Sequence, residues 1–283
     1  MTSTLLDALL ERYPKNGKIA EKWTMATGAP FTWDSLTKPN MSRFANWLCS
    51  DMAKSSARQY CAKLKAVIEP YTDEADLPKD WRRFLTVKDD ESQHTYLTES
   101  EIKRLIEYKP ETLTEATVQQ QFILGCLTGA RHSDYSRFNE SNITPEGNLV
   151  YVSQKTHIRA ELPLSPIARE ILFATGRTFP GAYKREVSDT TFNDTIRRIC
   201  YFSDIDNVIS LYRNGAFWTG KKCDAVSSHT SRRSFCTNLY LRCRDILLVS
   251  KLAGHSDVKM TERYICCGME SLTESAMNYF KSF

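Results

Sequence analysis

The stretch that decides the fold spans residues 227–265, and its two ends read S-S-H-T-S-R-R-S-F-C-T-N-L-Y (227–240) and L-A-G-H-S-D-V-K-M-T-E-R-Y-I (252–265). His229 and Arg232 are three residues apart, so on a helix they share one face. One of these side chains can exchange a proton while its neighbour holds an anion. The run Gly254-His255-Ser256 then interrupts the helical pattern, with Ser256 as the expected N-cap of a short helix that ends near Tyr264.

Each of these residues alone has an ordinary structural interpretation, because a lone His or Tyr on a helix usually serves packing. Their combination resembles the C-terminal signature of tyrosine recombinases, the DNA integrases and resolvases. That signature is His-x-x-Arg, then Gly-His, then a nucleophilic Tyr nine residues after the second His. Here the interval from His255 to Tyr264 is nine residues.

The resemblance requires an earlier Arg and a Lys on a β-hairpin. Arg131 stands in T-G-A-R-H-S-D (128–134) after an apolar helical pattern, and Asp134 follows it by three residues. Lys155 lies between a predicted strand at 149–152 and its predicted partner at 158–164, in the turn of a hairpin. All the elements occur once and in the expected order, and the resemblance covers residues 96–264.

The predicted fold class is mainly α with small β-hairpins (α+β), in two domains. Helical apolar spacing fills residues 1–90, and a polar linker follows at about residues 86–95. Thr98 and Glu101 have the spacing of a capping box that opens the second domain, residues 96–283. The resemblance implies a helical core-type DNA-binding domain followed by a catalytic domain, which together form a C-shaped clamp on DNA.

Four basic residues are predicted DNA contacts. Arg58, Lys63 and Lys65 lie on the polar face of the last long helix of the first domain. Arg233 follows Arg232 and stands where many tyrosine recombinases carry His. Residues 197–244 hold nine Lys or Arg against three Asp, an excess that suits a line of phosphates. An ordinary solvated face remains the alternative for these charges.

Composition indicates the cellular compartment and argues against a membrane span, a disulfide framework and a metal site. With 41% hydrophobic and 25% charged residues, the chain has the profile of a globular protein, and nothing in it suits a membrane span or a signal peptide. Its nine cysteines form no C-x-x-C pair, so neither a disulfide framework nor a metal site is indicated. These features favour a reducing cytoplasm, in a bacterial host if the resemblance holds.

Two segments carry predictions of their own. Asn214-Gly215 is a hairpin turn signal inside an insertion at residues 207–227, whose role stays open. Together with H-T-S-R-R, the insertion resembles integrases of Bacteroidetes phages and mobile elements. A last amphipathic segment contains Leu272, Ala276, Tyr279 and Phe280, and it either docks into a neighbouring protomer or folds back onto its own domain.

The resemblance implies a site-specific recombinase that cuts and rejoins DNA through a covalent 3′-phosphotyrosine. Its catalytic residues would be Arg131, Lys155, His229, Arg232, His255 and Tyr264. By the same resemblance, Asp134 would support them by orienting Arg131 and His229. Two arginines can clamp the phosphate oxygens, so no metal or other cofactor is expected, and no phosphate-binding loop for ATP occurs in the sequence.

The implied partners are double-stranded attachment sites and three further copies of the chain in a synaptic tetramer, with a monomer or dimer off DNA and possible accessory DNA-bending proteins. Integration or excision of a mobile element is the first interpretation. The alternatives are a Xer-like resolvase of DNA dimers, a type IB topoisomerase-like enzyme and a catalytically inactive DNA-binding protein.

Overall fold

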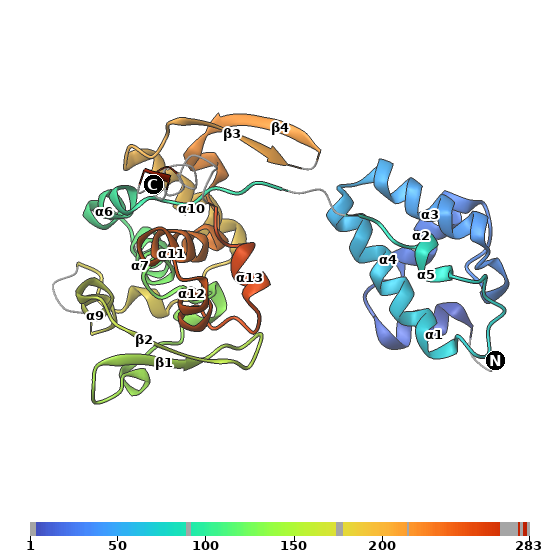
Figure 1. Ribbon diagram of the computed structural model, residues 1–283, viewed down its shortest axis with the longest axis horizontal. Helices are drawn as coiled ribbons and strands as arrows, with labels where there is room; N and C mark the ends of the chain where they lie inside the picture. Colours follow the sequence, from blue (N-terminus) through green and yellow to red (C-terminus); the bar gives the residue numbers. More distant parts are fainter. Residues whose placement is uncertain are drawn as a thin grey trace. The chain divides into compact units, whose positions relative to one another are not determined.

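The computed structural model describes residues 4–88, 92–173, 178–213, 215–266, 277, 280 and 281. It divides the chain into two compact units, shown in Figure 1. The first comprises residues 1–92 with 212–216, and the second comprises residues 93–211 with 217–283.

Within residues 4–88 the first unit consists of helices and the loops between them. Its helices are α1 (Leu5–Arg12), α2 (Lys18–Thr27), α3 (Lys38–Asp51), α4 (Lys54–Ile68) and α5 (Trp81–Phe84), with 3-10 turns η1 (Trp33–Ser35) and η2 (Glu69–Tyr71). Thr4 opens α1 with a capping box and Thr37 caps α3. The core is centred on Trp23, Phe44 and Leu64, all fully buried.

The second unit is a helical body with two β-hairpins. Its helices are α6 (Glu99–Glu107), α7 (Leu113–Thr128), α8 (His132–Tyr135), α9 (Pro166–Leu172), α10 (Asp189–Phe202), α11 (Ser228–Cys243), α12 (Ile246–Leu252) and α13 (Val258–Glu262). The 3-10 turns are η3 (Glu140–Asn142), η4 (Ala182–Lys184) and η5 (Lys222–Ala225). The fold is therefore mainly α with small antiparallel sheets, as predicted.

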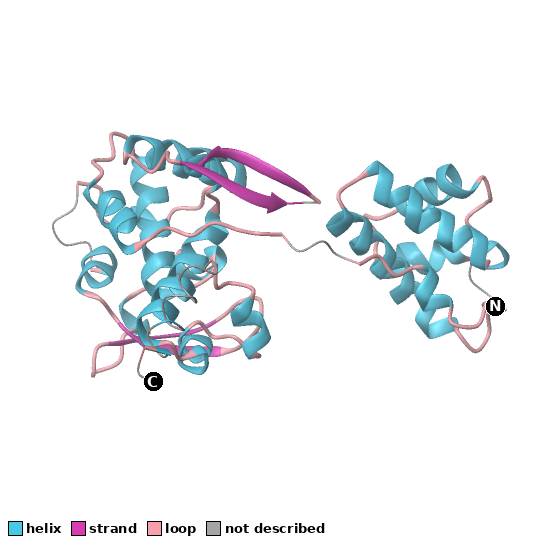
Figure 2. Cartoon of the chain, turned by 45° about the horizontal axis from the view of Figure 1, so that its top comes forward, coloured by secondary structure: helices cyan, strands magenta, loops and turns pink. Residues whose placement is uncertain are grey.

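The two hairpins lie on opposite sides of these helices (Figures 1 and 2). Strands β1 (Asn148–Val152) and β2 (Arg159–Pro163) pair antiparallel, with Asn148 opposite Pro163 and Val152 opposite Arg159. Strands β3 (Val208–Arg213) and β4 (Ala216–Lys221) form the second sheet, within the predicted insertion. Lys155 lies in the turn between β1 and β2, at the position expected from the sequence.

Helices α7 and α11 pack closely in the middle of the second unit. A Cβ atom added to Gly125 of α7 would lie 2.4 Å from the Ser231 hydroxyl oxygen of α11, so the contact requires two small residues. Buried glutamines of α7 donate their side-chain N–H groups to backbone carbonyls; Gln121, for example, donates to the Tyr183 carbonyl at 2.7 Å. The helix ends at Gly129 in the left-handed conformation (φ 66°), where an added Cβ would meet Phe235.

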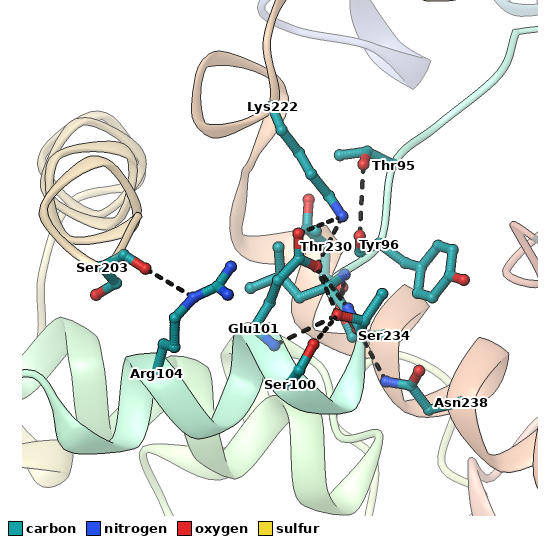
Figure 3. Close-up of polar contacts among 12 residues, drawn as sticks. Thr95, Tyr96, Ser100, Glu101, Arg104, Ser203, Lys222, Thr230, Ser234 and Asn238 are labelled. Atoms are coloured by element: carbon teal, nitrogen blue, oxygen red, sulfur yellow. Dashed lines mark hydrogen bonds and ion pairs between the residues drawn. The ribbon is translucent and has the colours of Figure 1, made fainter. Parts of the chain in front are cut away.

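The start of the second unit is tied to α11 (Figure 3). The backbone N–H of Leu97 donates to the Ser234 hydroxyl at 2.8 Å, and the Asn238 amide donates to the Leu97 carbonyl at 2.9 Å. Near the Leu97 segment, the Lys222 ammonium lies 2.7 Å from the Glu101 carboxylate in a buried ion pair. Glu101 also accepts from the backbone of Thr98 in the predicted capping box. These contacts fix the entry into the second unit against the helix that carries His229 and Arg232.

One predicted cap was wrong, and some predictions lie beyond the described residues. Asp257, not Ser256, caps α13, because the Asp257 carboxylate accepts from the Lys259 backbone N–H at 3.1 Å. Asn214, Leu272, Ala276 and Tyr279 lie outside the described residues. No helix in the described ranges is long and apolar enough to cross a membrane.

Candidate active site

Arg131 is placed by the end of α7 and the start of α8. The left-handed turn at Gly129 redirects the chain, and Arg131 is then the extended N-cap residue of α8. Its guanidinium donates to the Ser153 hydroxyl at 2.9 Å, in the turn of the β1–β2 hairpin. A longer contact of 3.5 Å reaches the Thr156 hydroxyl. Arg131 is thus held against the turn that carries Lys155.

Asp134 supports this arrangement through Ser153. One carboxylate oxygen of Asp134 accepts from the Ser153 hydroxyl at 3.0 Å, and the other accepts from the backbone N–H of Gln154 at 2.9 Å. Asp134 and Ser153 are both buried. The link from Asp134 to Arg131 therefore runs through Ser153, whereas the sequence suggested that Asp134 orients Arg131 and His229 itself.

Arg232 is buried with part of its guanidinium unpaired. Its side chain is 1% exposed, and one terminal nitrogen donates to the Gly129 carbonyl. The Nε and Nη2 atoms have no hydrogen-bond partner in the described protein. An arginine buried this way is costly unless an anion completes its hydrogen bonds.

Tyr264 lies beside this guanidinium, in the turn that follows α13. Its ring centroid is 5.2 Å from Cζ of Arg232 and 5.1 Å from the ring of His255, which it stacks at 24°. The Tyr264 carbonyl accepts from the Thr237 hydroxyl of α11 at 3.2 Å. The half-buried Tyr264 side chain therefore lies beside Arg232 and His255 of its own chain.

His255 completes the pocket from the α12–α13 connection. Its Nδ1 lies 2.9 Å from the Thr261 hydroxyl, while its buried Nε2 has no partner in the described protein. Burial, with the charges of Arg232 and Arg131, lowers the pKa of His255 to about 3. The ring is therefore neutral at ordinary pH.

His229 and Lys155 lie at the open edge of the cluster. Both residues are exposed, one at the start of α11 and the other in the hairpin turn. Partial burial of the imidazole lowers the pKa of His229, and the charges of Arg233, Lys155, Arg232 and Arg131 lower it further. Arg131 contacts the turn that carries Lys155, and Tyr264 lies beside Arg232 and His255. His229 shares helix α11 with Arg232, so the structure brings the six predicted catalytic side chains to one region of the second unit.

The four predicted DNA contacts lie in both units, unlike the predicted catalytic residues, which all lie in the second. Arg58, Lys63 and Lys65 belong to α4 in the first unit, where Lys63 donates to Asn16 at 2.7 Å and Lys65 to Thr86 at 3.3 Å. Arg233 is in the second unit and contacts the segment of Tyr264. None of the described residues forms a group of three or more His, Cys, Asp or Glu that could hold a metal ion.

Comparison with known proteins identifies the family. Residues 95–268 match the model described as the phage integrase family. The chain belongs to the phage integrase family. It is a tyrosine-type site-specific recombinase. It is also 25% identical over 244 residues to tyrosine recombinase XerD of Oceanobacillus iheyensis strain HTE831, covering 82% of this chain and 78% of the relative.

Solved integrase structures share the fold. A lambda integrase (residues 75–356) dimer bound to a COC′ core site superposes with a TM-score of 0.66 at 16% identity, covering 93% of this chain and 95% of that one. The Tn1549 transposon integrase in complex with a circular intermediate DNA gives a TM-score of 0.65 at 12% identity, with 98% and 100% covered.

Sequence reasoning missed several residues of this integrase site. Ser153 bridges Asp134 and Arg131, Thr261 contacts His255, and Thr237 holds the backbone of Tyr264. Tyr151 is also buried here, near Arg232 and Arg131 but outside hydrogen-bond geometry, and burial raises its pKa to about 12. Strand alternation was the available signal, because Tyr151 and Ser153 face the same way as Leu149.

Ser153→Ala is expected to slow DNA cleavage and to destabilise the fold. The change removes the acceptor of Arg131 and leaves a buried Asp134 oxygen without its donor, which costs about 1–3 kcal/mol of unfolding free energy. Urea denaturation and single-turnover cleavage measure the two effects. Thr156→Val is the control, since its contact with Arg131 is 3.5 Å long, and it should change both quantities less. Equal effects of the two variants would contradict the bridging role.

Stability is expected to fall as pH decreases from 6.5 to 5, in part because of His255. Its folded pKa of about 3 lies below the ordinary value of 6.5, so in this window the unfolded chain binds a proton that the folded chain does not. The stability present above the unfolded pKa is therefore lost as pH falls. Urea denaturation at several pH values should give a shallower dependence for His255→Gln. An identical pH dependence in the variant would refute this assignment.

Proposed function

We propose that the chain cuts and rejoins DNA at attachment sites through a covalent 3′-phosphotyrosine at Tyr264. The observation that carries the proposal is the buried Arg232 guanidinium, whose Nε and Nη2 atoms are unpaired beside the Tyr264 ring. Arg131 approaches the same place from α8. A phosphodiester is an anion with two non-bridging oxygens, so it suits two neighbouring guanidiniums.

In this proposal the protein stabilises the transition state by charge and hydrogen bonds. Arg131 and Arg232 bind the non-bridging oxygens, on which negative charge accumulates during attack. When the Thr261 hydroxyl donates to Nδ1 of His255, the ring proton lies on Nε2 and can be donated to the same phosphate. The site thus offers donors from three elements before the substrate arrives.

Two residues move the protons. The Tyr264 oxygen forms a bond to phosphorus while the bond from phosphorus to the 5′-oxygen breaks. His229 accepts the phenol proton, for which its lowered pKa supplies the neutral form at pH 7, and Lys155 gives a proton to the departing 5′-oxygen. Rejoining reverses these steps, and the ester preserves the bond energy without ATP.

The first unit is proposed to bind the core of the attachment site. Arg58 and Lys65 line a shallow surface pocket together with Thr86 and Lys88, whereas the Lys63 ammonium bonds to Asn16. Clustered cations of this kind bind phosphates with strong salt dependence. The proposal takes residues 1–90 as the domain that binds the core of the attachment site and residues 96–283 as the catalytic domain. The two domains would form a C-shaped clamp around the duplex.

Integration or excision of a mobile element is the preferred role. Solved relatives with the same fold include the lambda integrase tetramer bound to a Holliday junction and the Tn1549 transposon integrase with a circular intermediate. By analogy, this chain would act as a tetramer on two duplexes inside a bacterial cell. A Xer-like resolvase stays the second candidate, favoured by the similarity to XerD.

The test is covalent trapping on a nicked suicide substrate that carries the attachment site. In EDTA and without ATP, the protein should form an adduct that resists sodium dodecyl sulfate, and peptide mapping should place the 3′-phosphate on Tyr264. Site-independent relaxation of plasmids would favour the topoisomerase alternative. DNA binding without any adduct would favour an inactive DNA-binding protein and refute the proposal.

A further inference from the structure

Arg233 directly follows Arg232 in the sequence and has no part in the chemistry proposed above. It follows Arg232 on α11, so its side chain leaves the helix about 100° away from that of Arg232. Arg232 is directed into the interior, while Arg233 is half-buried at the rim. Burial lowers the pKa of Arg233, as expected for a guanidinium removed from water.

The contacts of Arg233 are with the tyrosine segment of its own chain. Its Nη1 donates to the carbonyl of Arg263, the residue before Tyr264, at 3.3 Å. Its Cζ atom lies 5.4 Å from the centroid of the Tyr264 ring. One side chain therefore contacts both the backbone before Tyr264 and the ring of the proposed nucleophile.

The tyrosine segment is held by backbone, side-chain and packing contacts besides those of Arg233. Helix α13 is short and ends at Glu262, so Tyr264 lies in a turn. The anchors of this turn are the Tyr264 N–H on the Thr261 carbonyl at 2.9 Å and the Thr237 hydroxyl, which accepts from the Cys266 N–H at 3.0 Å. The Tyr264 ring also packs against the small core cluster of Cys236, Val249 and Ala253. Arg233 therefore adds a polar contact on the Arg263 side of the turn to this packing and to the contacts with Arg232 and His255.

We propose that Arg233 is a positioning residue for the nucleophile: it clamps Arg263 and the Tyr264 ring of its own chain against α11. The inference rests on the proposed role of Tyr264. A guanidinium over an aromatic face attracts the ring, and a nucleophile displaced by about 1 Å loses roughly 100-fold in rate. Arg233 thus acts on the rate of attack, whereas a DNA contact would act on affinity.

The first experiment compares Arg233→Gln, Arg233→Lys and wild type in single-turnover cleavage of a suicide half-site at saturating DNA. Arg233→Gln should be slower by roughly 10- to 100-fold, with Arg233→Lys between it and wild type and with unchanged affinity for uncleaved DNA. Arg242→Gln is the matched control on the same helix, because Arg242 makes only a surface ion pair with Glu99 at 2.8 Å, and it should cleave normally. A wild-type cleavage rate with weakened affinity in Arg233→Gln would overturn the proposal in favour of a DNA contact.

A second readout separates positioning from proton transfer and from general loss of structure. DNA with sulfur in place of the scissile 5′-oxygen has a leaving group that needs no proton, so it should restore cleavage by Lys155→Ala but not by Arg233→Gln. Restoration of Arg233→Gln by this substrate would overturn the positioning role. Thermal unfolding of Arg233→Gln should match wild type, and a large decrease would likewise overturn it.

A mixing experiment tests whether Arg233 acts within its own chain. Arg233→Gln supplies Tyr264 without the clamp, and Tyr264→Phe supplies the clamp without the nucleophile. Mixtures on a full site should remain as slow as Arg233→Gln alone, and recovery of the fast rate would overturn the proposal. If Tyr264→Phe alone forms the adduct, the proposed function fails instead, so the two failures are distinguishable.

Discussion

Tyr264→Phe is expected to abolish the covalent protein–DNA adduct while DNA affinity stays unchanged. The phenol oxygen is the only atom removed, and it is the atom proposed to bond to phosphorus. The stack on His255 and the contact with the Arg232 guanidinium use the ring face, which phenylalanine retains. The phosphate-binding donors of the site therefore remain in place.

Denaturing gels on the suicide substrate and fluorescence anisotropy on uncleaved DNA measure the two quantities. Tyr240→Phe is the matched control, since Tyr240 is another half-buried tyrosine of α11 whose ring lies 5.9 Å from the Arg244 guanidinium. It should form the adduct at the wild-type rate. An adduct that persists in Tyr264→Phe would transfer the nucleophile role to another residue.

The sequence allowed prediction of those parts of the site that depend on spacing along a helix or on a turn signal. The three-residue interval from His229 to Arg232 places both on α11, and the hairpin signal placed Lys155 in a turn. Local propensity was less decisive where neighbours compete, as with the choice of Asp257 over Ser256 as a cap. Serine and aspartate side chains can both accept a hydrogen bond from a backbone N–H at a helix start. The predicted and observed N-caps therefore differ by a single residue.

The remaining features depend on tertiary contacts that no local pattern encodes. Ser153 meets Asp134 only because the β1–β2 turn folds back over α8. Lys222 and Glu101 are 121 residues apart and form a buried pair. Charge alone suggested a DNA contact for Arg233, which stays a prediction, and it did not reveal that the guanidinium lies 5.4 Å from the centroid of the Tyr264 ring. Side-chain direction is thus the information missing from the sequence.

Arg232→Met is expected to reduce cleavage by a factor of about 100–1000 or more without reducing stability. The loss follows from removing transition-state donors, for which one donor is typically worth that factor. Stability should be equal or higher, because the Arg232 guanidinium is 1% exposed and two of its nitrogens lack partners in the described protein. Exchanging an incompletely paired buried charge for an apolar side chain of similar length relieves a desolvation cost.

Arg198→Met provides the opposite pattern as a control. Arg198 is partly exposed and pairs with Glu115, whose side chain is 5% exposed, so this change leaves a buried carboxylate without its cation. It should lower the unfolding free energy by up to about 3–5 kcal/mol and leave the cleavage rate of the folded protein unchanged. Urea denaturation and single-turnover cleavage separate the two variants.

The same reasoning predicts how DNA changes the stability of each protein. A ligand that binds only the folded state stabilises it in proportion to its affinity, and the phosphate pairs with the Arg232 nitrogens only in the folded site. Attachment-site DNA should therefore raise the melting temperature of wild type more than that of Arg232→Met. If DNA raises the melting temperature of both proteins equally, the unpaired nitrogens of Arg232 do not bind phosphate. The proposed chemistry would then lack the observation that supports it.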